Sequence, residues 1–281
     1  MRLISYRSER GDRAGVLRDG GVIDAADVLG DGAPRSLRGL LGADALDALG
    51  DAVGAAEPSV GLGEVELLAP VPNPQKIICI GLNYADHAAE AAIVAPPVPT
   101  FFAKFANALV PDGAPVNLPA ASTKLDYEAE VAFVIGRPAR DVTLADALGH
   151  VAGYTLLNDL SARDLQFQTP QWMPGKVFDG SAPCGPALLT PDEVPDPGDI
   201  GIAMDLNGQR MQKASTRDLI FGTRELIAHL STLMTLVPGD IVSTGTPAGV
   251  GSTRDPRVWL KPGDELLVSS PQLGELRTTI A

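Results

Sequence analysis

Residues 125–135, LDYEAEVAFVI, place acidic side chains at the start of a segment with the pattern of a buried β-strand. Because successive side chains of a strand point to opposite faces, Glu128 and Glu130 project from the same face. The opposite face is apolar, with Val131, Phe133 and Ile135. Two carboxylates about 7 Å apart in a half-buried strand repel each other and lose hydration. A divalent cation held by oxygen ligands would relieve both costs, whereas solvated glutamates on an exposed strand edge are the alternative.

The composition is that of a folded protein with one large domain, or with one medium and one small domain. The chain has 281 residues, of which 45% are apolar and 20% charged, so it can bury a sizeable core and is not disordered throughout. The formal net charge of −13 and the lack of a Lys/Arg cluster argue against a nucleic-acid partner. The sequence has neither a signal peptide nor an apolar run of about 18 residues. We therefore expect a cytoplasmic protein without membrane contact.

The chain is expected to form two units, a small α/β domain over residues 1–70 and a larger domain over residues 71–281. The best linker candidate is residues 69–74, which contain three prolines. In the first unit we expect strands at residues 3–6, 14–17 and 22–23, a hairpin turn at 18–21 and a helix at 43–56.

The larger unit has a mainly β character with few helices. Apolar runs bounded by Gly, Pro and Asp predict strands at residues 76–80, 131–135, 151–157, 187–189, 200–206, 240–243 and 265–268. Helical spacing predicts helices at residues 85–92, 144–148 and 223–234. The pattern indicates an α+β fold with an antiparallel or mixed β core, not a doubly wound parallel sheet.

A third acidic candidate, Asp159, follows the predicted strand at residues 151–157. It stands at a turn, where a carboxylate can point into a cleft, although an aspartate at such a place is more often a turn cap. With Glu128 and Glu130 it would complete an all-oxygen site that favours Mg²⁺, with Mn²⁺ or Ca²⁺ possible, and disfavours Zn²⁺. Asp126 has the same strand parity as the two glutamates, so parity alone does not exclude it.

His87 and Glu90 stand three residues apart in the predicted helix at residues 85–92, so they share a helix face and can pair. A carboxylate orients an imidazole and raises its basicity, which suits a general base acting on water. A surface ion pair on an exposed helix is the alternative. Side chains that could bind a carboxylate or an oxyanion follow later in the chain, at Arg163, Gln166 and Lys176.

Taken together, five segments resemble the fumarylacetoacetate hydrolase family and occur in the family's order. They are residues 80–90 with His87 and Glu90, 126–130, 153–164, 175–176 and 238–251. Each segment is weakly specific alone, but the ordered set is highly specific and covers most of the larger unit. The resemblance implies a mainly β catalytic domain with a mixed β-roll, a small N-terminal domain and a homodimer.

The resemblance also implies roles for individual residues. The implied Mg²⁺ ligands are Glu128, Glu130 and Asp159, with Asp126 structural. The implied catalytic residues are His87, Glu90 and Lys176. The implied substrate contacts are Arg163, Gln166 and Thr246. The long animal hydrolases of the family use a further Asp ligand upstream of the histidine, where Asn83 or a neighbour stands in this chain. That departure places the chain with the shorter bacterial branch, whose substrates are acylpyruvates and related 2,4-dioxo acids.

The implied reaction is Mg²⁺-dependent hydrolysis of the C–C bond of a 2,4-dioxo acid, such as an acylpyruvate, fumarylpyruvate or a diketo-deoxy-sugar acid. The cation would stabilise the departing pyruvate enolate, and His87 oriented by Glu90 would deprotonate the attacking water. Two alternatives stay open. The same site could decarboxylate or isomerise oxaloacetate-like acids or 2-hydroxy-dienoates. From another functional class, the chain could be a catalytically inactive homologue that binds a small molecule.

Overall fold

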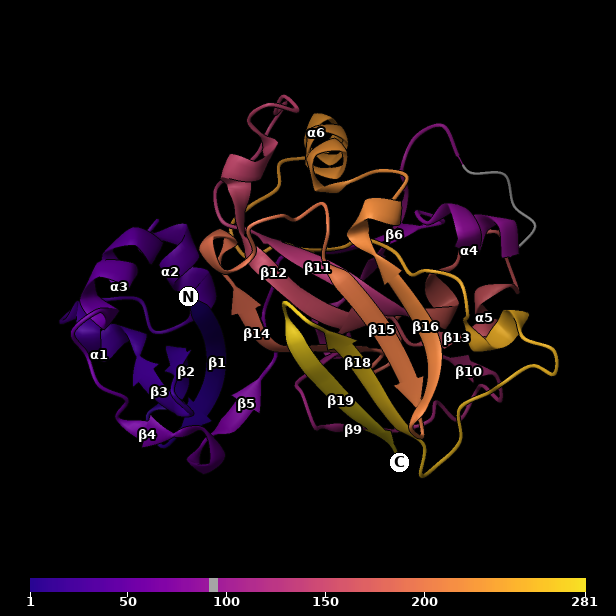
Figure 1. The fold of residues 1–281 in the computed structure, drawn as a ribbon, viewed down its shortest axis with the longest axis horizontal. Coiled ribbons are helices and arrows are strands. Elements are labelled where there is room, and N and C mark those ends of the chain that lie inside the picture. The colour runs from indigo at the N-terminus through magenta and orange to yellow at the C-terminus, as the bar shows by residue number, and fades with distance from the viewer. Residues whose placement is uncertain (91–95) are drawn as a thin grey trace.

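The computed structural model describes residues 1–90 and 96–281 and shows β-sheets with helices at their edges and ends (Figure 1). The strands are β1 (Arg2–Ser8), β2 (Gly11–Arg18), β3 (Gly21–Asp24), β4 (Val60–Gly61), β5 (Glu66–Leu68), β6 (Ile77–Gly81), β7 (Thr100–Lys104), β8 (Leu109–Val110), β9 (Pro115–Val116), β10 (Leu125–Asp126), β11 (Ala129–Ile135), β12 (Val151–Asn158), β13 (Ser161–Ala162), β14 (Ala182–Leu189), β15 (Gly201–Leu206), β16 (Gln209–Ser215), β17 (Ile241–Ser243), β18 (Glu265–Ser270) and β19 (Gly274–Ile280). The α-helices are α1 (Ala25–Leu29), α2 (Leu37–Gly42), α3 (Leu46–Val53), α4 (Ala85–Glu90), α5 (Arg163–Gln166) and α6 (Thr223–Leu233).

One large mixed sheet joins the N-terminal strands to the central ones. Within the described ranges its order is β4-β3-β2-β1-β14-β12-β11-β17-β6-β7, with β5 beside β1 and β8 beside β14. β1 pairs antiparallel with β14, and Leu3 lies opposite Leu188. The N-terminal strands and α1–α3 form one end of the molecule, whereas α4 and α5 lie toward the other end (Figure 1). The backbone is therefore hydrogen-bonded across the two expected units, and the boundary at residue 70 stays a prediction.

A second sheet, β16-β15-β18-β19-β9, packs on one face of the large sheet and closes the main core. The alternation of β11 sorts its side chains between two apolar clusters, as the sequence predicts. One cluster lies between the sheets and includes Val131, Phe133 and Ile135. The other includes Ala132 and Val134, together with side chains of the N-terminal helices. The prediction of a mainly β, α+β fold with few helices is confirmed.

Tight turns set the register of the antiparallel hairpins. Asp19-Gly20 connects β2 to β3, and Asn207-Gly208 connects β15 to β16. All four residues have positive φ, between 51° and 78°. Two-residue hairpin turns require this backbone, which Asp-Gly and Asn-Gly supply at little steric cost. The hairpin turn predicted at residues 18–21 is therefore confirmed.

Two predicted helices differ from the structure. Residues 144–148 run through a turn into a 3₁₀-helix, Ala147–His150, and do not form an α-helix. The hydroxyl of Thr143 accepts a hydrogen bond from Asp146 N and lies 2.7 Å from its carboxylate, a local turn that competes with helical hydrogen bonds. The helix predicted at residues 43–56 is shortened to α3, because Asp44 has a φ of 51° and cannot continue a right-handed helix.

The helix predicted at residues 85–92 is observed as α4, and residues 91 and 92 lie outside the described residues. None of the helices that the structure describes is long and apolar enough to cross a bilayer.

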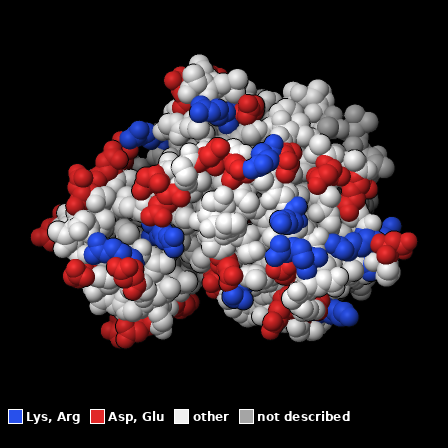
Figure 2. All heavy atoms as spheres, in the orientation of Figure 1, with Lys and Arg blue, Asp and Glu red and all other residues white. Residues whose placement is uncertain are grey.

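Figure 2 shows acidic side chains spread densely over the N-terminal end of one face, whereas Lys and Arg gather over β16 and the neighbouring loops. The charge is therefore unevenly distributed over this face of the molecule.

Gly153 provides a test of the packing within the large sheet. It lies on β12 beside β14, and a Cβ atom there would sit 2.3 Å from the carbonyl oxygen of Leu189. Because the clashing atom belongs to the backbone, Gly153→Ala should lower the free energy of unfolding by about 2 kcal/mol. Urea denaturation followed by circular dichroism measures the loss. Gly149→Ala is the matched control, since its Cβ would meet nothing within 4 Å. Equal midpoints for Gly153→Ala and wild type would contradict this packing.

Candidate active site

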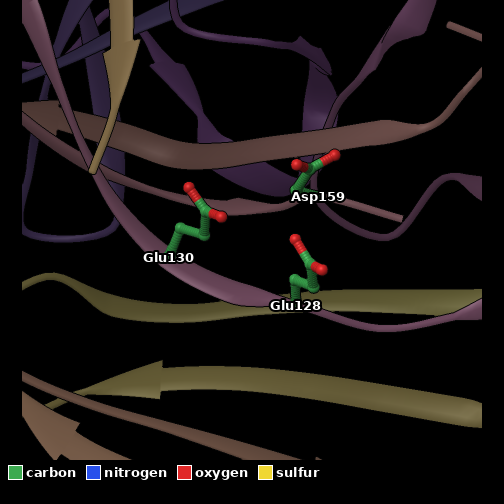
Figure 3. A group of neighbouring side chains, drawn as sticks. All are labelled: Glu128, Glu130 and Asp159. Carbon is green, nitrogen blue, oxygen red and sulfur yellow. The ribbon is translucent and has the colours of Figure 1, made fainter. Parts of the chain in front are cut away.

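Three buried carboxylates meet where β11 and β12 run side by side. The carboxylates of Glu128, Glu130 and Asp159 each offer an oxygen within 4.8 Å of the others. They come from different elements and are directed toward a common space (Figure 3). Glu130 belongs to β11, and Asp159 directly follows β12. The structure thus brings together the three residues expected to bind a metal.

The backbone around Glu128 differs from the sequence-based expectation. Glu128 does not lie in a strand with Glu130, because β10 ends at Asp126 and β11 begins at Ala129. In this break, Glu128 N donates to the side chain of Asn158, and Asp159 N donates to Glu128 O at 2.8 Å. These bonds fix Glu128 against the end of β12. Strand parity predicted the right pair of glutamates although one of them lies outside the strand.

Two cations hold Glu128 in its ionised form. Lys176 Nζ lies 2.8 Å from Glu128 and 2.8 Å from Asp159, and Arg163 Nη1 lies 2.7 Å from Glu128. Burial alone would raise the pKa of Glu128, but Lys176 and Arg163 lower it well below its usual range. Burial would lower the pKa of Lys176, but Asp159 and Glu128 raise it above its ordinary value. Lys176 is therefore a fixed cation and not a base.

Glu130 lacks such compensation. Its carboxylate accepts hydrogen bonds from the Ser243 hydroxyl and from Gly245 N, both neutral donors. Burial, together with the nearby carboxylates of Asp159 and Glu128, raises the pKa of Glu130 to about 8. A cation placed among the three carboxylates would remove the cause of this shift.

The donor set fits a hard divalent cation. It consists of carboxylate oxygens, the ligands that Mg²⁺, Mn²⁺ and Ca²⁺ prefer. The buried Oδ1 of Asp159 accepts no hydrogen bond from any described residue, so a lone pair is available to a metal. Glu130 has only neutral hydrogen-bond donors among the described residues, so a bound cation would be its counter-charge. Which of the three metals binds stays a prediction, and the sequence favours Mg²⁺.

A buried lysine that the sequence analysis missed supports Asp159. Lys104, the last residue of β7, is fully buried, and its Nζ lies 2.7 Å from Asp159 Oδ1 without hydrogen-bond geometry. Its ammonium donates instead to backbone carbonyls, including that of Ser181 at 2.9 Å. Because a lysine at a strand end is usually solvated, the sequence did not indicate that Lys104 is buried. The only signal was its strand parity with the buried Phe102, two residues earlier.

Asp126 has a structural role in the site. Its carboxylate accepts hydrogen bonds from Gly251 N at 2.7 Å and from Ser252 N at 3.0 Å, and Arg163 Nε donates to it at 2.8 Å. Asp126 therefore orients Arg163 and fastens the loop that follows residue 246, without facing the three carboxylates. Asn83 is structural too, since its side chain is bonded to the backbones of Phe221 and Thr244.

A cavity of about 510 Å³ opens beside the carboxylates and is lined by Glu128, Glu130, Lys176 and most of the other expected site residues. His87 lines it from α4, with Nδ1 3.6 Å from the carboxylate of Glu90. Glu90 accepts a hydrogen bond from Gly249 N at 3.0 Å. The predicted pair is therefore close in space, although it is not hydrogen-bonded.

The residues expected to contact substrate also line this cavity. Arg163 Nη1 donates to Gln166 Oε1 at 2.9 Å, while the buried Nη2 has no partner among the residues described. Such an orphaned donor is what a ligand carboxylate would satisfy. The hydroxyl of Thr246 donates to Ala129 O and accepts from Gln212 Nε2. That proton is already used, so Thr246 would offer its backbone N–H.

Residues 76–281 match the family described as fumarylacetoacetate (FAA) hydrolase C-terminal. The chain belongs to the fumarylacetoacetate hydrolase family. The match covers the cavity and all the site residues described above, so the resemblance carried by the five sequence segments is confirmed.

Relatives within the fumarylacetoacetate hydrolase family differ in the reactions that their names state. Oxaloacetate tautomerase fahd2, mitochondrial, of Xenopus laevis is 40% identical over 287 residues, which cover 100% of this chain and 90% of that protein. The structure of maleylpyruvate hydrolase from Sphingobium sp. SYK-6 has a TM-score of 0.82 and 32% identity, covering 100% of this chain and 99% of its own. That of 5-carboxymethyl-2-hydroxymuconate delta-isomerase from Mycobacterium smegmatis has a TM-score of 0.80 and 32% identity, with the same coverage.

These similarities are wider than the bacterial branch expected from the sequence, since they include an animal protein. They support an enzyme of this family, but the named reactions include a tautomerase, an isomerase and a hydrolase. The word mitochondrial is part of the name of the Xenopus laevis relative and describes that protein. A cytoplasmic location and a homodimer stay predictions for this chain.

Glu130→Gln tests the metal site with little disturbance, because the partners of Glu130 are neutral and the new amide oxygen can still accept their hydrogen bonds. We expect Mn²⁺ affinity to fall by about 100-fold or more, measured by isothermal titration calorimetry. The rise in melting temperature that Mn²⁺ gives the wild type should also be lost. Glu90→Gln is the control and should retain Mn²⁺ binding. Unchanged affinity in Glu130→Gln would remove Glu130 from the site.

Proposed function

We propose that this protein is a divalent-metal-dependent tautomerase or isomerase of 2-oxo acids, with oxaloacetate as the simplest substrate. The observation that carries the proposal is the 40% identity to an oxaloacetate tautomerase over the whole chain. It favours the alternative reading of the sequence over C–C bond hydrolysis. In this reaction a proton leaves the C2 hydroxyl of the enol and a proton is added at C3. No carbon–carbon bond breaks and no water is consumed.

The carboxylates and cations of the site suit the charge that develops in this reaction. A divalent cation bound by Glu128, Glu130 and Asp159 would act as a Lewis acid toward the 2-oxo group. Arg163 and Gln166 would orient the substrate's C1 carboxylate through the free Nη2 and the side-chain amide. Lys176, kept protonated by Glu128 and Asp159, would stabilise the enolate oxygen. These donors are fixed by contacts within the protein before substrate arrives, which favours electrostatic stabilisation of the enolate.

The proton carrier would be His87. Among the described side chains that line the cavity, His87 is the one histidine, and an imidazole is a group that can both accept and donate a proton. Its Nδ1 lies 3.6 Å from the carboxylate of Glu90, and the imidazole would take up the proton that leaves the enol hydroxyl. The same imidazolium can then return a proton to C3. One group therefore suffices for both transfers.

Hydrolysis of a 2,4-dioxo acid is the second candidate, supported by the 32% identity to maleylpyruvate hydrolase and by the same pair, His87 and Glu90. It needs one further component, a water molecule held between the imidazole and the distal carbonyl. Because the two reactions use the same enolate and the same imidazole, substrates and products must distinguish them. Decarboxylation of oxaloacetate is a third outcome, and it requires no base.

The test is a substrate panel with Mg²⁺ or with EDTA. Loss of the enol absorbance of oxaloacetate reports tautomerisation, coupled pyruvate detection reports decarboxylation, and disappearance of an acylpyruvate reports hydrolysis. We expect fast, EDTA-sensitive ketonisation of oxaloacetate without stoichiometric pyruvate. Efficient acylpyruvate cleavage without ketonisation would reverse the order of the two candidates.

His87→Ala tests the proton carrier. Tautomerase kcat should fall by about 100-fold or more, because general acid–base catalysis contributes that much. Mn²⁺ affinity should change far less than in Glu130→Gln, since His87 supplies none of the three carboxylates. His150→Ala is the matched control and should keep full activity, because His150 is bonded to Arg137 O outside the cavity. If His87→Ala retained wild-type ketonisation, another group would have to carry the proton.

A further inference from the structure

The imidazole of His87 is placed by the backbone of α4. Its buried Nδ1 has no hydrogen-bond partner among the residues that the structure describes, and the carboxylate of Glu90 lies 3.6 Å away. The far end of α4 is attached to the loop after β17, because Glu90 accepts a hydrogen bond from Gly249 N. The direction in which the imidazole enters the cavity therefore depends on how the chain leaves β6 and begins α4.

Leu82 makes this connection with a backbone conformation that leucine rarely adopts. Its φ is 56°, in the left-handed region. The other non-glycine residues with positive φ within residues 1–90 and 96–281 are all exposed aspartates or asparagines: Asp19, Asp44, Asp141 and Asn207. Asp and Asn tolerate this region, whereas a bulky residue is strained there. A turn alone would favour glycine or asparagine at position 82.

The residues on both sides of Leu82 hold it in this conformation. Gly81 packs against Trp172, since a Cβ atom at Gly81 would sit 2.4 Å from Cζ3 of the indole. The side chain of Asn83 donates to Phe221 O at 2.9 Å and accepts from Phe221 N at 2.9 Å. A strained residue persists only where its surroundings fix it in this way, and such residues concentrate at functional sites.

The strained residue lies at the cavity itself. Leu82 and His87 line the same cavity, and α4 begins at Ala85, soon after Leu82. A different φ at Leu82 would change the direction of the chain that follows it, and α4 would carry the imidazole to a different place. Displacement of a catalytic group by about 1 Å can lower a rate by roughly 100-fold. The backbone of Leu82 is therefore in a position to control the rate of proton transfer.

We propose that Leu82 is a positioning residue for the proton transfer and that it acts through its left-handed backbone, which directs His87 toward the substrate. This assignment rests on the proposed function for the role of His87. It gives Leu82 an effect on kcat and none on the binding of metal or of the substrate's C1 carboxylate, which belong to the three carboxylates and Arg163.

Two substitutions at Leu82 separate the effect of the backbone from that of the side chain. Leu82→Ile keeps the volume and the apolar character, but its β-branched side chain is disfavoured in the left-handed region. Leu82→Asn loses the apolar character and tolerates that region. The measurement is ketonisation of oxaloacetate with Mg²⁺ present, with kcat and KM determined separately.

We expect kcat to fall about tenfold or more in Leu82→Ile, because the imidazole is displaced. In Leu82→Asn it should stay within about threefold of the wild type, since the turn is kept. KM should change by less than about twofold in both variants, because the change affects the chemical step and not binding. A residue that only packs against the cavity wall would tolerate isoleucine better than asparagine, so the opposite order of the two kcat values overturns the proposal.

Asp19→Ile is the matched control for backbone strain. Asp19 has a φ of 51° in the exposed turn between β2 and β3, outside the cavity. Isoleucine should lower the melting temperature there, as it does at position 82, and should leave kcat unchanged. An equal fall of kcat in this control would overturn the proposal, because lost stability would then explain the effect. If Leu82→Ile does not fold, Leu82→Asn decides, and a kcat below about a tenth of the wild type overturns the role of the backbone.

Failure of the proposed function would look different. If oxaloacetate is not ketonised by the wild type, the reaction is wrong, and NMR of the imidazoles still tests the placement. The chain has three histidines, so the resonance of His87 is identified by its loss in His87→Ala. It should move further from its wild-type position in Leu82→Ile than in Leu82→Asn. The reverse order would overturn the role of Leu82 independently of catalysis.

Discussion

The structure depends on the burial of more negative charge than the protein neutralises by itself. Glu128, Glu130 and Asp159 are buried beside the cavity and face one another. Lys104, Lys176 and Arg163 form ion pairs with Glu128 or Asp159, but no ion pair to Glu130 is found within the described residues. Buried charges are stable only when paired and hydrogen-bonded. The surrounding strands supply the partners of these carboxylates. β7 contributes the ammonium of Lys104, and β17 contributes the hydroxyl of Ser243, which donates to Glu130 near the start of β11. A cation among the carboxylates would complete this arrangement.

The sequence could predict those parts of the fold and site that rest on short-range rules. Alternation predicted how β11 divides its side chains, and Asp19-Gly20 predicted a hairpin. The turn after the strand at residues 151–157 made Asp159 a candidate third ligand, and the family resemblance favoured this role over that of a turn cap. Lys104 was missed because its role depends on β7 lying beside β6 and near residue 159, a long-range placement. The break before Ala129 was missed for a similar reason, since it is stabilised by Asn158 on the neighbouring strand.

The choice between tautomerisation and hydrolysis depends on water and not on the charged groups. Every cation and carboxylate near Glu128 would assist any reaction that passes through a 2-oxo-acid enolate. What separates the reactions is whether a water molecule can stand between His87 and the substrate's carbon chain. A substrate that fills more of the cavity of about 510 Å³ leaves less room for such a molecule than a short one. Substrate length and reaction type are therefore linked in this cavity.

A buried amide, that of Gln212, helps to tie the loop that follows Ser243 to the second sheet. Gln212 on β16 donates to Thr246 Oγ1 and Pro247 O, and its oxygen accepts from Ala129 N. Its neighbour Lys213 faces solvent. Because side chains alternate along a strand, a shift of β16 by one residue would bring an ammonium to this place, which can donate but cannot accept. Ala129 N would lose its partner beside Glu130. The pairing register of an edge strand that carries no site carboxylate thus determines whether the three-carboxylate site keeps its shape.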